Sequence, residues 1–283
     1  MTGRREETEA NERTDCAATR RACLAMMATG AATAVLPSGN VLAVDDKAPG
    51  AIDAHTHFYD PTRPEGVPWP SKDDALLYRP VLPGELKRLT RNLNMSGTIV
   101  LEASSWPQDN PWLLDLAARE PFIVGVVGRL DTARDDFGKQ LARFVKDKRF
   151  RGIRINHDEL KTALGRPAQL DRLRLLAEND RELDVNGGPE MPADVARLTR
   201  AVPELRIVIN HAANLKIDGK GVPESWRSGM RAAAAGARVY CKVSALAEGT
   251  GKKHGDAPAD VDFYRPVLDA LWEIFGVDRL IYG

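Results

Sequence analysis

The chain has 283 residues, of which 43% are hydrophobic, and its 40 basic and 40 acidic residues give a formal net charge of zero. This hydrophobic content supports a substantial core and excludes a globally disordered chain. A neutral chain lacks the positive charge that binds nucleic acid or anionic membranes, so we expect a small-molecule partner and no nucleic acid. The three cysteines, Cys16, Cys23 and Cys241, have no paired spacing, which argues against a disulfide framework or a zinc knuckle.

Residues 1–43 have the order of a signal peptide, with a charged stretch, a short uncharged run rich in Ala and Met, and small residues after it. The apolar run is shorter than the roughly 20 residues that span a bilayer. Arg20 and Arg21, directly before it, resemble a twin-arginine export signal. We expect a signal peptide over 1–43, a linker over 44–49, and a periplasmic or secreted protein without membrane contact after cleavage. The alternative is a disordered or amphipathic extension on a cytoplasmic protein.

From residue 50 onward, short apolar or β-branched runs alternate with segments of helical period. The runs predict eight buried strands, at Ala51–Ala54, Gly97–Ala103, Phe122–Arg129, Phe150–Asn156, Leu183–Asn186, Arg206–Asn210, Arg238–Ser244 and Arg279–Tyr282. Near-continuous apolar strands that alternate with helices indicate a parallel sheet covered by helices. Eight such strands close a barrel, so we expect an α/β fold, a (β/α)8 TIM-type barrel, over residues 50–283.

The alternative fold is an open doubly wound sheet, which requires a Gly-rich turn after the first strand. His55-Thr56-His57-Phe58 stands there instead, which favours the barrel. Helix signals agree: Asn110-Pro111 is predicted to cap and begin a helix, and Gly276 is predicted to end the helix Tyr264–Phe275.

Polar residues at the carboxyl ends of the strands are the candidates for chemistry, because the active sites of such barrels lie there. His55 and His57 end the first strand and, two residues apart, point to the same face. His211 follows the sixth strand and should reach the same mouth. Three imidazoles there can bind a divalent metal or flank a substrate carbonyl. The alternative is histidines packed in a polar rim.

Two further strands offer cations. Ile153 and Ile155 should face the helices, which leaves Arg154 inside the barrel for a substrate carboxylate or hydroxyl, or for a structural ion pair to Glu102. Lys242, on the seventh strand, could orient substrate or act as a strut inside the barrel. His157, just past the fourth strand, is a weaker candidate for substrate binding.

These strand ends resemble the amidohydrolase-related superfamily, within it the metal-optional branch of sugar-lactone and 2-pyrone-4,6-dicarboxylate lactonases. The resemblance covers residues 51–283. It rests on the opening Ile52–Pro61, on Pro121–Gly128 and Arg151–Arg154, on Ile209–His211, on Cys241–Leu246 and on Gly276–Gly283.

The resemblance implies hydrolysis of a cyclic ester, the lactone of a sugar acid or a related carboxylated molecule. His55, His57 and His211 would polarise the carbonyl, with or without one bound divalent metal, zinc first among the candidates. Arg154, with Tyr59 and Asn186, would hold substrate oxygens. The alternatives are a metal-dependent decarboxylase of the same superfamily and a non-catalytic or degenerate periplasmic binding protein.

Two positions depart from the resemblance. Asn210 stands where the branch usually has an aspartate before the histidine. After Gly283 the branch continues with Ser, Asp or Asn, Trp and Pro, and that acid would be the general base or a fourth metal ligand. On this basis we expect a barrel truncated after its eighth strand, without its last helix, and therefore unstable and inactive until it is extended by about one βα unit.

Overall fold

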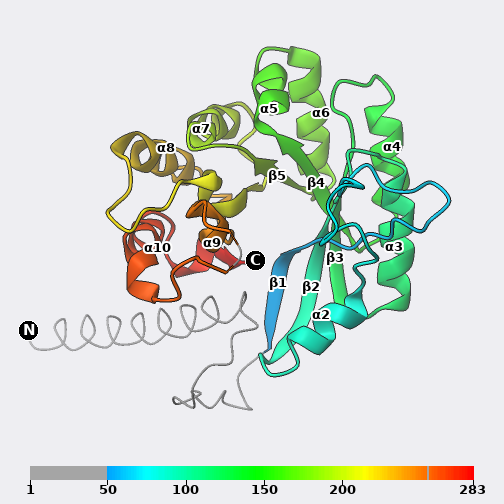
Figure 1. The fold of residues 1–283 in the computed structure, drawn as a ribbon. Helices are drawn as coiled ribbons and strands as arrows, with labels where there is room; N and C mark the ends of the chain where they lie inside the picture. Colours follow the sequence, from blue (N-terminus) through cyan, green and yellow to red (C-terminus); the bar gives the residue numbers. More distant parts are fainter. Residues whose placement is uncertain (1–49, 254) are drawn as a thin grey trace, which may run out of the picture.

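The computed structural model describes residues 50–253 and 255–283 (Figure 1). The expected signal peptide over 1–43 and the linker over 44–49 lie outside these described residues. None of the helices in the two described ranges is both long and apolar enough to cross a membrane.

Eight parallel strands form one sheet in sequence order, as the alternation predicted. They are β1 (Ala51–Thr56), β2 (Met95–Leu101), β3 (Ile123–Gly128), β4 (Phe150–Asn156), β5 (Glu182–Asn186), β6 (Ile207–Ile209), β7 (Val239–Val243) and β8 (Leu280–Tyr282). The end of β8 lies against β1, since a Cβ added to Gly283 would be 2.9 Å from that of His55. The sheet is therefore a nearly closed barrel, and the expected TIM-type fold is confirmed.

Helices surround the strands (Figure 1). They are α2 (Pro83–Leu89), α3 (Asp109–Arg119), α4 (Phe137–Phe144), α5 (His157–Leu164), α6 (Pro167–Glu178), α7 (Met191–Ala201), α8 (Glu224–Ala234), α9 (Leu246–Gly249) and α10 (Val261–Phe275), with the 3-10 turns η1 (Asn210–Asn214) and η2 (Val277–Arg279). The main core lies between these helices and the strands, where Ile153 and Ile155 are buried as predicted. Arg154 between them points into the barrel.

One predicted helix start is wrong in detail. Helix α3 begins at Asp109, and Asn110 lies inside it instead of capping it. The Asn110 side chain is used elsewhere, because Nδ2 donates to the Arg129 carbonyl at 2.7 Å and Oδ1 accepts from the Arg129 amide at 2.8 Å. This clamp fixes the backbone at the carboxyl end of β3. The predicted end of α10 is confirmed, with Gly276 at φ 67°.

Candidate active site

A cavity of about 790 Å³ opens at the carboxyl ends of the strands, within the usual size range for small-molecule sites. Its lining comes from the ends of all eight strands, from the segment between β1 and α2 and from α9: His55, His57, Pro68, Trp69, Leu77, Glu102, Ala103, Ser105, Arg129, Arg154, Ile155, Asn156, Asn186, His211, Ser244, Ala245, Glu248 and Gly283. We call this cavity the mouth pocket. A smaller cavity of about 420 Å³, between α3 and α4, has no histidine in its lining.

The mouth pocket brings the three predicted histidines together. The ring centroids of His55 and His57 are 5.0 Å apart, and those of His55 and His211 are 4.2 Å apart. Burial is the main cause that lowers the pKa of each ring, to about 3 for His57 and about 4 for His211, and Lys242 and Arg154 add to it. All three rings are therefore neutral at neutral pH.

The hydrogen bond of His57 fixes its tautomer. Nδ1 lies 3.1 Å from the carbonyl oxygen of Leu101, which can only accept, so Nδ1 carries the proton. Nε2 is then left with its lone pair. His57 can accept a hydrogen bond from water or bind a metal there, but it cannot donate to an oxyanion.

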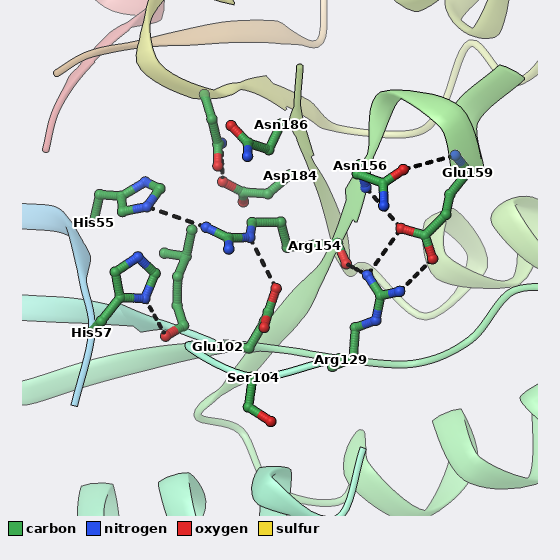
Figure 2. Close-up of polar contacts among 12 residues, drawn as sticks. His55, His57, Glu102, Ser104, Arg129, Arg154, Asn156, Glu159, Asp184 and Asn186 are labelled. Carbon is green, nitrogen blue, oxygen red and sulfur yellow. Dashed lines mark hydrogen bonds and ion pairs between the residues drawn. The ribbon is translucent and has the colours of Figure 1, made fainter. Parts of the chain in front are cut away.

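His55 lies between two cations. Its Nε2 is 3.4 Å from Arg154 Nη1, and its Nδ1 is 3.5 Å from Lys242 Nζ (Figure 2 shows the Arg154 contact). Burial first, and then Lys242, lower the pKa of His55. Because both neighbours are donors, protonation of this ring would place three positive groups in contact.

His211 is positioned by an unusual backbone segment. Strand β6 ends at Ile209, and the residues from His211 to Asn214 all have positive φ, between 45° and 58°. This left-handed region costs non-glycine residues roughly 1–2 kcal/mol each, so the segment requires support. The His211 ring is held by Ser244, whose Oγ lies 2.8 Å from Nδ1.

Hydrogen bonds to three residues outside this left-handed segment, Trp226, Asn186 and Gly187, hold it in place. The indole Nε1 of buried Trp226 donates to the Ala212 carbonyl at 2.9 Å. Asn214 Nδ2 donates to Asn186 Oδ1 at 3.0 Å and to the Gly187 carbonyl at 2.9 Å. Backbone strain that is held by surrounding contacts is typical of functional sites.

Both guanidinium groups of the mouth pocket are bound to carboxylates (Figure 2). Arg154 Nε donates to Glu102 Oε1 at 2.9 Å, which is the ion pair expected as the alternative to substrate binding. Arg129 binds Glu159 through both terminal nitrogens, with Nη1 3.0 Å from Oε2. Burial raises the pKa of Glu102, and Arg154 opposes that shift.

A buried ion pair lies below the pocket. Lys242 Nζ is 2.5 Å from Asp184 Oδ1, and the two residues are 2% and 0% exposed. Asn210 Nδ2 donates to the same oxygen at 2.5 Å. An amide at position 210 can donate to Asp184, whereas a second carboxylate would repel it. Asn210, which stands where the related branch usually has an aspartate, is therefore compatible with the carboxylate of Asp184.

The structure does not bring every predicted residue to the pocket. Asn186 lines it, but Lys242 is buried beneath it in its ion pair with Asp184. Tyr59 is buried outside it, with its hydroxyl donating to the Leu77 carbonyl at 3.2 Å. His157 begins α5 and pairs with Asp194 at 2.9 Å, also outside the pocket. Helix formation directly after β4 turns His157 away from the mouth.

Sequence reasoning missed four site residues: Arg129, Glu159, Asp184 and Glu248. Asp184 could have been found, because it alternates with Leu183 and Val185, which are both buried in the core. Ser244 lies two residues from Lys242, on the strand face where the alternation predicts it. Glu159 gave no such signal. It lies in the first turn of α5, where it forms a capping box with Asn156, and it contacts Arg129 from there.

The residues that could hold a metal are the three imidazoles. Their nitrogen donors suit zinc, and the Nε2 of His57 has a lone pair. However, both nitrogens of His55 face cationic donors, which oppose a divalent ion. Across 50–253 and 255–283, no three His, Cys, Asp or Glu side chains are grouped as metal ligands. The fit to a three-histidine metal centre is therefore poor, whereas His57 and His211 remain available.

Known proteins resemble this chain in the same region. Residues 52–283 match the amidohydrolase family. The chain is 32% identical over 234 residues to the L-fucono-1,5-lactonase of Burkholderia ambifaria, covering 82% of this chain and 78% of that protein. It is 28% identical over 240 residues to the L-fucono-1,5-lactonase of Burkholderia multivorans, covering 82% and 80%. The chain therefore belongs to the amidohydrolase family and is a hydrolase. Within that family it is similar to the lactonases.

Solved structures share the barrel. An amidohydrolase from Burkholderia multivorans with bound zinc has a TM-score of 0.71 at 24% identity, with 83% of each chain covered. A putative 2-pyrone-4,6-dicarboxylic acid hydrolase from Pseudomonas putida has a TM-score of 0.62 at 23% identity, with 83% of this chain and 82% of that chain covered. At these identities the likeness shows the fold.

Proposed function

We propose that the protein hydrolyses the ester bond of a sugar-acid lactone in the mouth pocket. The observation that carries the proposal is the convergence of three neutral imidazoles and Arg154 on one cavity at the carboxyl ends of the strands. The similarity to two L-fucono-1,5-lactonases supports the substrate class.

The reaction adds water to the lactone carbonyl carbon, the ring C–O bond breaks, and the ring oxygen takes a proton to give a hydroxy acid. The His57 Nε2 lone pair can orient the attacking water. Arg154 can donate to the carbonyl oxygen as negative charge develops there. Ser244 can donate to His211 Nδ1, which leaves the Nε2 of that ring as a second donor to the oxyanion.

We propose that the general base lies at the end of the eighth strand. The resemblance places an acid after Gly283, and Gly283 lies in the lining of the mouth pocket. A carboxylate at that end of β8 would share the mouth with His57 and take the proton of the attacking water.

Zinc is proposed as an optional occupant. His57 and His211 would hold it, and it would supply Lewis-acid polarisation of the carbonyl. Arg154 can donate a hydrogen bond to the same carbonyl oxygen, so the proposed chemistry does not depend on the metal.

The test is release of acid from a panel of sugar-acid 1,5-lactones, above the spontaneous rate. We expect His57→Ala to lower kcat by roughly 10²-fold or more, because orientation of the water is lost. His157→Ala is the matched control, since His157 pairs with Asp194 outside the pocket, and it should keep kcat within about twofold. Equal kcat values for these two variants would contradict the role of His57. Release of carbon dioxide from a carboxylated substrate would indicate a decarboxylase instead.

We also propose export through the twin-arginine route, on the basis of Arg20 and Arg21 before the apolar run. Replacing both by Lys should leave uncleaved precursor in the cytoplasm, as judged by fractionation and immunoblotting. Lys at Arg4 and Arg5, the other paired arginines near the start, is the control and should leave export intact. Unchanged export of the Arg20 and Arg21 variant would contradict the route.

A further inference from the structure

The mouth pocket has cations but no uncompensated positive charge. Arg129 and Arg154 are the two cationic residues in its lining, and the described residues pair them with Glu159 and Glu102 respectively. Lys242, beneath the floor, is paired with Asp184. Each positive group that a substrate carboxylate could approach is therefore already neutralised by the protein.

One carboxylate in the lining has no such partner. Glu248 lies on the short helix α9, is exposed, and lines the mouth pocket. No salt bridge joins it to any cation within the described part of the chain. Counting Arg129, Arg154, Glu102, Glu159 and Glu248 at their charged states gives two positive and three negative groups, a net charge of −1 around the pocket.

Neutral groups supply the rest of the polar lining. Asn156 and Asn186 each use Oδ1 to accept a hydrogen bond within the protein, which Figure 2 shows for Asn156, and each amide keeps an NH₂ group for a ligand. Trp69, 42% exposed, adds an apolar wall. Amide donors beside an aromatic ring match a ligand with hydroxyl groups on a carbon ring.

We propose that the mouth pocket selects lactones of neutral, polyhydroxylated acids against lactones that carry a carboxylate, and that Glu248 is a residue that determines this specificity. This inference rests on the proposed lactonase function. A carboxylated lactone would meet Glu248 and no free cation, and like-charge contact is a general device for rejecting the wrong ligand. The reaction product is itself a carboxylate, so the same charge favours its release.

The experiment compares two lactones of the same ring and hydroxyl pattern, an aldono-1,5-lactone and the aldaro-1,5-lactone that carries a carboxylate at the terminal carbon. The measured quantity is the ratio of kcat/KM for the neutral and the charged substrate. We expect a ratio above about ten in the unchanged protein. Glu248→Gln should lower that ratio by about three- to tenfold, the scale of one charge acting through a partly solvated pocket.

Two further variants test whether the ratio depends on charge at the pocket. Glu159→Gln frees the charge of Arg129 and should also lower the ratio, while Gln still serves in the capping box that begins α5. Glu178→Gln removes the same charge at the exposed end of α6, far from the lining, and should leave the ratio unchanged. Circular dichroism confirms that each variant is folded.

A binding measurement separates this inference from the proposed function. Calorimetry with the corresponding pair of unreactive 1,5-lactams reports the charge preference without turnover. Preference for the neutral lactam without lactone hydrolysis would overturn the lactonase function and leave the charge selection standing. A pocket that takes the charged ligand equally well, or a ratio in Glu248→Gln equal to that in Glu178→Gln, would overturn the selection itself.

Discussion

Protonation decides what each histidine can do in this site. His57 donates a hydrogen bond from Nδ1 to the Leu101 carbonyl, so its Nε2 remains an acceptor. His211 contacts a hydroxyl that can donate or accept, so it can offer a donor to the oxyanion. The three imidazoles therefore have different roles, although at the level of sequence they were expected to polarise the carbonyl together.

The lowered pKa values predict how the rings titrate. His57 and His211 should show midpoints near pH 3 and pH 4 in the ¹H–¹³C NMR spectrum of their Cε1–H groups, and none near 6.5. The unfolded chain titrates near 6.5, so these rings favour unfolding as the pH falls from 6.5 toward 3. A midpoint between pH 6 and 7 for His57 would contradict the lowering of its pKa by burial.

Strand periodicity explains which site residues could be predicted. His55, His57 and Arg154 were found because alternation along β1 and β4 directs them into the barrel. The same rule applied to β5 would have found Asp184. The pairing of Arg129 with Glu159 could not be found in this way, because it depends on how the first turn of α5 lies over the end of β3.

Among the elements, the segment after β6 departs most from what local preference allows. The residues from His211 to Asn214 are in the left-handed region, and none of them is glycine. Sequence patterns predict the buried strand well, since Ile207, Val208 and Ile209 are apolar. They do not predict this turn, because its stability comes from Trp226, Asn186 and Gly187, which lie elsewhere in the chain.

The support from Trp226 can be tested directly. Trp226→Phe removes the hydrogen bond to the Ala212 carbonyl, and we expect kcat to fall about tenfold or more because His211 loses its position. The free energy of unfolding should fall by about 1–3 kcal/mol, the cost of leaving a buried carbonyl unpaired. Trp112→Phe, on α3 away from His211, is the control and should keep kcat. Normal kcat in Trp226→Phe would show that the turn is held without the indole.

At the scale of the whole molecule, the barrel has an apolar shell and a charged interior. Apolar strands and amphipathic helices made the fold predictable. The interior charges are paired across strands, Arg154 with Glu102 and Lys242 with Asp184. Burying such pairs costs desolvation energy that their attraction offsets only in good geometry. Both pairs also place a cationic group beside His55, because Arg154 Nη1 and Lys242 Nζ lie 3.4 Å and 3.5 Å from its ring nitrogens.

This arrangement leads to a prediction about metal. Arg154 and Lys242 occupy the surroundings of His55 that a metal would need, and Arg154 would donate to the carbonyl oxygen of a bound lactone. Removing metal with a chelator, followed by dialysis, should therefore leave kcat/KM within about threefold, with metal content measured by mass spectrometry before and after.

Arg154→Met is the matched variant. It should bind zinc more tightly, because the repelling charge beside His55 is gone. It should also lose activity by roughly 10²-fold or more. Loss of activity on chelation, restored in proportion to added zinc, would instead make the metal essential and the cations beside His55 secondary.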